Sequence, residues 1–130
     1  MTVHDKLDYL MLNGVNTLKY AGMMTIDGTN ESATLGTGAF YYTIASYETC
    51  ERALAIIHPT VNGLTDNIVY HYRNNVLIKE FQGIKHDIAI PNTSWYSQCL
   101  IVFLEDLREG DKLFLKGGGT GGRDMMYYTF

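Results

Sequence analysis

The sequence predicts an all-β domain preceded by one short helix. Tyrosine and glycine are abundant, with ten and thirteen residues, whereas the chain has only two prolines. Tyrosine favours half-buried strands and glycine marks turns and tight backbone, so this bias favours β-structure. Beyond residue 14, strand-like segments recur at intervals of roughly 8–12 residues, which is typical of a sandwich or barrel rather than of β-α-β units.

The length and composition indicate one globular domain. With 130 residues, of which 46% are hydrophobic and 18% charged, the chain can build one core but not two. It has no apolar run long enough to cross a bilayer and no visible secretory signal peptide, so we expect no membrane insertion. The formal charge is −4 and the ten Lys and Arg residues are scattered, so we expect no nucleic-acid partner.

Residues 1–14 predict a short helix, a shaft or oligomerisation leader. Thr2 and Asp5 have the spacing of a capping box, with Asp in place of the usual Glu. Four apolar side chains then share one helical face, and an Asn-Gly pair supplies a stop. These four are Val3, Leu7, Leu10 and Met11. A helix this short is marginal alone and must dock on something. Residues 15–130 are expected to form a single β-sandwich domain.

We expect about eight strands after the helix. The strand-like segments are 18–26, 39–47, 52–63, 67–73, 76–81, 85–91, 98–107, 111–117 and 124–130. The clearest signal is the hairpin formed by "NIVYHYR" and "VLIKEF". Asn74 and Asn75 between them suit the positive φ angles of a two-residue turn. Alternation along the first of these strands places His71 and Arg73 on the face opposite to the tyrosines.

The glycine-rich segment "KGGGTGGRD", residues 116–124, is interpreted as a connection between the last two strands. Its glycines satisfy G-x-G-x-x-G, and a strand precedes them. A dinucleotide site also needs a helix whose N-terminus faces the pyrophosphate, and only a short aromatic segment follows. Arg123 and Asp124 stand where a P-loop requires Lys and Ser or Thr. A phosphate-binding loop is therefore not expected.

Histidines and cysteines lack the spacing of a metal site. No two histidines lie at i, i+2 or i+4, and Cys50 and Cys99 are far apart in the sequence. We interpret the histidines as surface or strand-face residues. The cysteines are interpreted as buried free thiols, with a disulfide as the alternative in an oxidising compartment. The oxygen-rich segment 27–32 lacks the residue order of a calcium loop. No metal or cofactor is expected.

Acidic residues cluster around the predicted turn at residues 108–110. They are Glu105, Asp106, Glu109 and Asp111. A solvated turn explains this cluster better than the paired carboxylates of a glycosidase do. The chain also has no recognisable nucleophile motif. We therefore predict that the protein is not an enzyme.

The segment "PNTSWYSQ", residues 91–98, is the best candidate for ligand binding. It contains the single Trp of the chain beside a Tyr, in a run of small polar residues. Trp95 could stack on a sugar ring, and Asn92 and Tyr96 could form hydrogen bonds with it. The alternative is that Trp95 fills the core or a subunit interface.

The order of elements from Tyr41 to Lys116 resembles the jelly-roll domains of the C1q and tumour-necrosis-factor superfamily. The resemblance rests on "AFYYTIAS", "VYHYRNNVLIKEF" and "SQCLIVFLEDLREGDKLFLK". In the last stretch a long apolar strand leads into Leu-x-x-Gly-Asp, here Leu107, Gly110 and Asp111. The resemblance implies an all-β, jelly-roll-like β-sandwich with a short N-terminal helix, and it implies a homotrimer.

The opening "HDKLDYLMLNGVNTLK" is similar to short helical leaders on virion proteins of phages that infect Gram-positive bacteria. Tail fibres and receptor-binding proteins of such phages often end in trimeric heads of C1q-like shape. The resemblance implies that the helical seam lies on a threefold axis and that sheet-face tyrosines join the interface. The interface candidates are Val3, Leu7, Leu10, Tyr41 and Tyr128.

Together these observations predict a non-enzymatic binding module of an extracellular virion. We expect a trimeric phage tail or virion head domain that recognises a cell-surface carbohydrate. Two alternatives remain open at this point. One is a structural virion protein, such as a capsid decoration protein, that contacts other virion proteins and has no sugar site. The other is a secreted C1q-like adaptor that binds protein.

Overall fold

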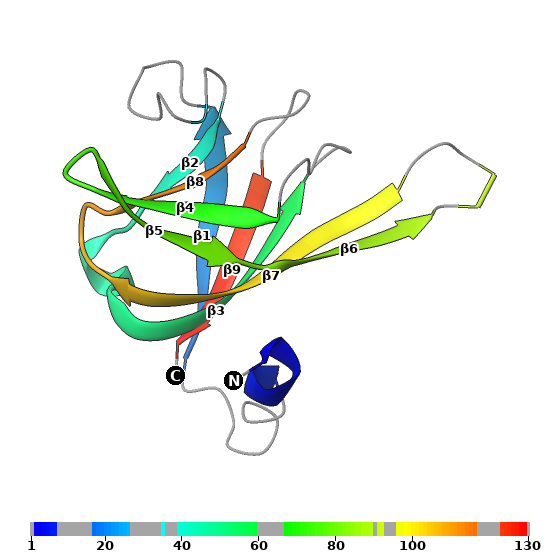
Figure 1. The fold of residues 1–130 in the computed structure, drawn as a ribbon, viewed down its shortest axis with the longest axis horizontal. Coiled ribbons are helices and arrows are strands. Elements are labelled where there is room, and N and C mark those ends of the chain that lie inside the picture. The colour runs from blue at the N-terminus through cyan, green and yellow to red at the C-terminus, as the bar shows by residue number, and fades with distance from the viewer. Residues whose placement is uncertain are drawn as a thin grey trace.

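The computed structural model describes residues 2–7, 17–26, 35, 39–59, 67–89, 91–92, 96–116 and 123–129. These residues form nine β-strands, a short helix at residues 3–7 and the 3₁₀ helix η1 (Figure 1). The elements are β1 (Thr17–Ile26), β2 (Phe40–Thr43), η1 (Ser46–Glu48), β3 (Cys50–Pro59), β4 (Ile68–Arg73), β5 (Val76–Gln82), β6 (Ile84–Ala89), β7 (Tyr96–Leu107), β8 (Lys112–Leu115) and β9 (Arg123–Thr129). Each predicted strand segment overlaps one of these strands, and the predicted all-β class is confirmed.

The strands follow a jelly-roll path. Three antiparallel pairs nest around the β4–β5 hairpin, because β3 pairs with β7, β2 with β8, and β1 with β9. Strand β6 is an addition at the edge of β7. The order is β5-β4-β8-β2-β1-β9-β3-β7-β6. Nested pairing of this kind produces the Greek keys of a jelly roll, which confirms the predicted sandwich.

Strand β1 belongs to both sheets of the sandwich. It pairs with β9 in sheet A (β6-β7-β3-β9-β1), and at Thr25 and Ile26 it pairs with β2 in sheet B (β1-β2-β8-β4-β5). The register with β9 shifts between Tyr20 and Gly22. Gly22 has a φ of 115°, which residues with a side chain rarely adopt. This glycine therefore lets one strand turn from the first sheet into the second.

The chain itself joins the other edges of the two sheets, at Gly83 between β5 and β6. The Gly83 amide donates a hydrogen bond to the Asn67 carbonyl at 2.8 Å. A Cβ atom at Gly83 would lie 2.8 Å from the Ile101 carbonyl oxygen and 2.8 Å from the Leu100 side chain. The corner therefore packs against β7 more closely than any side chain would allow.

Alternate residues of the strands fill the core between the sheets. The main cluster contains Met24, Phe40, Ile44, Ala53, Ala55, Ile57, Val69, Phe81, Leu100, Val102, Leu104, Leu107, Leu113, Leu115, Met125 and Tyr127. A second cluster lies on the outer face of sheet B and includes Tyr70, Tyr72 and Phe114, with Tyr41 packed beside them. The tyrosines of β4 thus cover the outside of the sandwich, and the opposite side of that strand faces the core.

The helix at residues 3–7 begins with the predicted capping box. The Thr2 amide donates to the Asp5 carboxylate at 3.0 Å, and the Asp5 amide donates to the Thr2 hydroxyl at 3.1 Å. Val3 and Leu7 pack against Leu54 and Phe103 on the outer face of sheet A. The predicted helix beyond residue 7 lies outside the described residues. No helix in the described part of the chain is long and apolar enough to cross a membrane.

Strand β2 is shorter than the predicted segment 39–47, because η1 interrupts it. The Glu48 carboxylate accepts hydrogen bonds from the Ala45 amide at 2.8 Å and the Tyr42 hydroxyl at 2.7 Å. The Tyr127 hydroxyl donates to the Glu48 carbonyl at 3.1 Å. Burial and the bonded Glu48 carboxylate together raise the pKa of the Tyr42 hydroxyl. These bonds hold the buried glutamate and turn the chain from sheet B towards sheet A.

Candidate functional site

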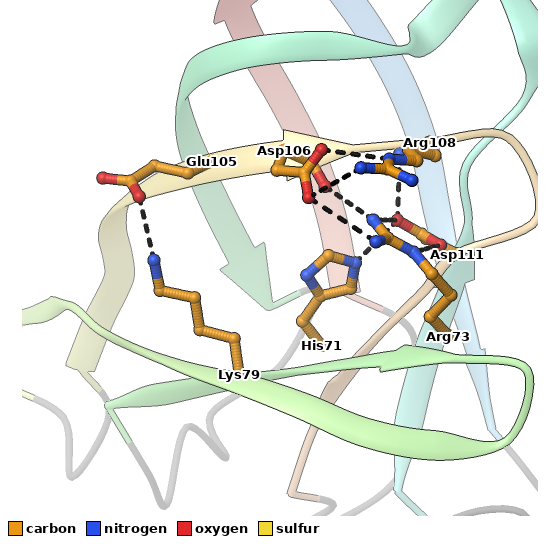
Figure 2. Close-up of polar contacts among 7 residues, drawn as sticks. All are labelled: His71, Arg73, Lys79, Glu105, Asp106, Arg108 and Asp111. Carbon is orange, nitrogen blue, oxygen red and sulfur yellow. Dashed lines mark hydrogen bonds and ion pairs between the residues drawn. The ribbon is translucent and has the colours of Figure 1, made fainter.

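A buried carboxylate organises the polar side chains at one end of the sandwich (Figure 2). The Asp111 carboxylate bonds His71 Nε2 at 2.7 Å. It also accepts from Arg73 Nε and Nη2, each at 2.9 Å, and from the Arg108 amide at 2.9 Å. The Arg73 guanidinium reaches on to the Asp106 carbonyl at 2.9 Å. We call His71, Arg73, Asp106, Arg108 and Asp111 the ion clamp.

The charge state of Asp111 follows from its partners. Burial alone would raise the pKa of this carboxyl, but hydrogen bonds from Arg73, the Arg108 amide and His71 outweigh it and lower the pKa to about 2. The same bond to Asp111 raises the pKa of Arg73. Asp111 is therefore ionised at neutral pH, and a carboxylate with bidentate Arg contact is among the stronger polar contacts in proteins.

His71 was predicted to be a surface or strand-face residue, and that prediction is wrong about its exposure. His71 is 1% exposed, and its ring stacks on Phe81 with centroids 5.7 Å apart. The predicted alternation of β4 is correct, but the side that carries His71 and Arg73 faces the interior. The predicted solvated acidic turn is likewise wrong for Asp111, which is 1% exposed. The buried His–Asp pair joins β4 to the turn that precedes β8.

A further ion pair joins β5 to β7 beside the ion clamp. Lys79 of β5 and Glu105 of β7 are 2.8 Å apart. The bond from Lys79 lowers the pKa of Glu105. Asp106 of β7 adopts a φ of 51° and pairs with Arg108 and Arg73. Figure 2 shows that Arg73 of β4 and Lys79 of β5 both reach across to residues of β7 here.

The predicted ligand-binding loop lies at the end of a two-stranded arm formed by β6 and β7 (Figure 1). Residues 96–99 pair with residues 86–89 of β6, whereas the pairing of β7 with β3 begins at Leu100. Asn92 is exposed in a turn before β7 and has a φ of 62°. Tyr96 begins β7 opposite Ala89. Trp95 lies outside the described residues. The ligand site at Asn92, Trp95 and Tyr96 therefore stays a prediction.

The predicted interface residues lie on different surfaces. Val3 and Leu7 contact sheet A of their own chain, and Leu10 lies outside the described residues. Tyr128 is half-buried on the outer face of sheet A. Tyr41 is on the outer face of sheet B, where its ring centroid is 5.7 Å from that of Phe114. An interface that uses both tyrosines must therefore pair the outer face of sheet A in one copy with the outer face of sheet B in the next.

Sheet A also carries an apolar row across four strands on its outer face. Its cross-strand partners are Ile84, Ile101, Ile56 and Met126. Ile84 and Met126 are 42% and 37% exposed, and Met23 on β1 is 45% exposed. The helix at residues 3–7 covers Leu54 and Phe103 beside this row. The row therefore exposes apolar side chains at both ends, with the partly buried Ile56 and Ile101 between them.

The two cysteines are free thiols, but they are half-exposed rather than buried as predicted. Among the described residues no group of three or more His, Cys, Asp and Glu side chains is placed to hold a metal ion. The segment 27–32 lies outside the described residues. No protein-family model, curated protein or solved structure matches this chain. Its function is therefore inferred from the residues and their geometry.

Proposed function

We propose that this protein is a non-enzymatic binding module, the trimeric head domain of a phage tail or virion, which recognises a cell-surface carbohydrate. The observation that carries the proposal is the β6–β7 arm, which extends beyond the pairing of β7 with β3 and bears the exposed Asn92. Recognition loops on a rigid scaffold can vary without disturbing the sheets, and a jelly roll is such a scaffold. Trp95 supplies the stacking surface, and Asn92 and Tyr96 supply hydrogen bonds.

The proposed homotrimer is supported by the exposed apolar row on sheet A. Contiguous apolar surface of this kind commonly marks a protein contact. Tyr128 adjoins the row, because its cross-strand partner Leu54 lies two residues from Ile56. A cyclic trimer pairs different surfaces of neighbouring copies, which allows Tyr41 to join from sheet B. Three linked sites would raise the avidity of a shallow sugar site.

The same apolar row favours a second candidate, a structural virion protein that contacts other virion proteins and has no sugar site. A secreted C1q-like adaptor would use such a surface in a similar way. These candidates differ from the first in needing no saccharide. A glycan array probed with the full chain separates them, since only the first predicts a selective signal.

The decisive variant is Trp95→Ala. We expect it to abolish glycan or cell binding while leaving the oligomeric state and melting temperature nearly unchanged. Tyr47→Ala is a matched control, because Tyr47 is 69% exposed and lies in η1, far along the chain from the arm. If Trp95→Ala instead unfolds or dissociates the protein, Trp95 belongs to the core or an interface, and the site at the arm is rejected.

A further inference from the structure

Strand β6 has one open edge in the described part of the chain. On its other side it pairs with β7, from Ile84 opposite Ile101 to Ala89 opposite Tyr96, without a shift of register. No described strand pairs with the open edge, because β6 ends the strand order. The backbone N–H and C=O groups along such an edge can pair with a further strand. The edge of β6 is therefore a template for strand addition.

The edge strand of the other sheet is protected in ways that β6 is not. Strand β5 ends sheet B, and its register with β4 shifts between His71 and Tyr72. A bulge of this kind twists an edge away from a straight partner. The pairing of β6 contains no bulge, and its sequence, Ile-Lys-His-Asp-Ile-Ala, contains no proline. What restricts the partner of β6 is the charge of its side chains and the order in which they occur.

The charges of β6 are arranged symmetrically about His86. Lys85 precedes this histidine, Asp87 follows it, and isoleucines at positions 84 and 88 flank the three. The segment therefore shows the same residue classes from either end, except that the sign of the charge changes. An antiparallel pair reverses the direction of one strand. Two β6 strands centred on the same histidine thus place each lysine opposite an aspartate of the other copy.

Neighbouring registers of the same two strands are less favourable. A pair centred on Lys85 places that lysine opposite itself, and a pair centred on Asp87 places two aspartates opposite each other. Like charges in directly opposite positions destabilise a sheet. Registers centred between two residues place one of the charged residues opposite an isoleucine. The charges therefore select the register centred on His86, where a neutral imidazole offers one donor and one acceptor to its counterpart.

The side chains of Lys85 and Asp87 are 33% and 40% exposed and already form an ion pair of 3.8 Å within their own chain. The Asp87 carboxylate also accepts a hydrogen bond from Gln98 Nε2 at 3.0 Å. These contacts persist when two strands pair, because an ammonium group has three donors and a carboxylate has several acceptor positions. The two ion pairs come together as a square of four alternating charges. A network of this kind contributes more than an isolated exposed pair does.

We propose that two copies of this chain associate through their β6 edges, antiparallel and centred on His86, so that sheet A of one copy continues into sheet A of the other. The contact is isologous, with the same strand on both sides. Two six-residue edges bury less surface than a stable interface needs, so the dissociation constant should be on the order of 100 µM. The contact uses a strand edge rather than the apolar row, and it does not rest on the proposed trimer or sugar site.

The test is sedimentation velocity of the full chain between about 1 µM and about 1 mM, which brackets the expected dissociation constant. We expect the weight-average mass at high concentration to be twice the mass at low concentration, whichever species is present at the start. In ¹⁵N NMR spectra, the amides of residues 84–88 should shift saturably over the same range. A constant mass, or saturable shifts confined to another surface, would overturn the proposal.

Charge exchange identifies the strand that pairs. Lys85→Glu makes all four charges of the square acidic, and Asp87→Lys makes all four basic. Each variant alone should pair about tenfold more weakly, because like charges then lie opposite each other. Mixed in equal amounts, the two variants should pair with each other, because the acidic strand meets the basic one. The double variant Lys85→Glu/Asp87→Lys should pair with itself as the native chain does.

Glu109→Lys is the matched control, because it changes the net charge as Asp87→Lys does and lies in the exposed β7–β8 turn. It should leave pairing unchanged, and it should not replace Asp87→Lys in the mixture. If it weakens pairing as much as Asp87→Lys does, or if the mixture fails to pair, the contact does not lie at β6. Should a single variant unfold, the double variant still decides, since its failure to pair would reject the register centred on His86.

Discussion

Asp111 and His71, forty residues apart in the sequence, share a 2.7 Å hydrogen bond in the interior of the sandwich. His71 belongs to β4, and Asp111 ends the turn that leads into β8, so the bond joins two paired strands at the edge of the core. An ionised carboxylate only accepts, so the Nε2 atom of His71 carries the hydrogen. The tautomer of the imidazole and the geometry of the neighbouring turn are thus fixed together.

Removing the charge of Asp111 should destabilise the fold. Asp111→Asn leaves the Arg73 guanidinium and the His71 imidazole without their anionic partner. Breaking a buried pair in this way costs about 3 kcal/mol. The free energy of unfolding measured in urea checks this value. Glu109→Gln on the same turn is exposed and serves as the control, with a change expected within about 0.5 kcal/mol. Equal effects of the two substitutions would contradict a special role for Asp111.

Acid should remove the contribution of Asp111 to stability. Its folded-state pKa, about 2, lies below the ordinary 3.8, so the native state favours the ionised form. The stabilisation, on the order of 2 kcal/mol, is complete above about pH 4 and is lost as the pH falls towards 2. The lowered pKa values of Glu105 and Asp106 act in the same direction. Urea unfolding at several pH values should show a flatter dependence for Asp111→Asn than for the native sequence; parallel curves would refute this prediction.

A side chain at the β5–β6 corner should be poorly tolerated. Gly83→Ala would place Cβ 2.8 Å from a carbonyl oxygen of β7, so the corner must move away, at a cost of about 1–3 kcal/mol. Gly110→Ala is the comparison, because no atom lies within 4 Å of its Cβ position. Its φ of 85° alone should cost about 1 kcal/mol. Thermal unfolding of both variants measures the two losses of stability. A smaller loss for Gly83→Ala than for Gly110→Ala would contradict the prediction.

Charge on the apolar row of sheet A should break the proposed trimer. Met126→Lys adds an ammonium group to a side chain that is already 37% exposed, so the monomer fold should survive. Burying that charge in an interface without a partner is unfavourable. Light scattering should show monomers for Met126→Lys and trimers for the control Tyr47→Lys. A trimer that persists in both would move the interface away from this row.

The sequence predicted the strands well because their signals are local. Asn74 and Asn75 both have the positive φ angles expected of the hairpin turn, and the capping box at Thr2 and Asp5 is present. Alternation separates the two faces of β4 but does not say which faces the core. That choice depends on contacts such as the pairing of His71 with Leu113, which comes from a distant part of the chain.

The polar interior was harder to predict for the same reason. Asp111 follows the turn glycine and precedes a strand of buried residues, and Arg73 lies on the same side of β4 as His71. This combination was the available signal for the ion clamp. The residue pattern could not show that His71 and Arg73 meet Asp111, because this contact depends on the pairing of β4 with β8. The candidate at the arm, in contrast, was predicted from side-chain chemistry alone and stays a prediction.

The pairing of β1 with β9 also determines how the domain responds to force. The register from Thr17 opposite Thr129 to Met24 opposite Arg123 places the outer ends of both strands together at one end of the sandwich. Tension applied between these two ends would peel the strands apart one bonded pair at a time, instead of loading all the backbone bonds at once. The domain would therefore be mechanically weak when pulled from both ends. Held from one end only, as the proposed head domain would be, it would carry no tension through this seam.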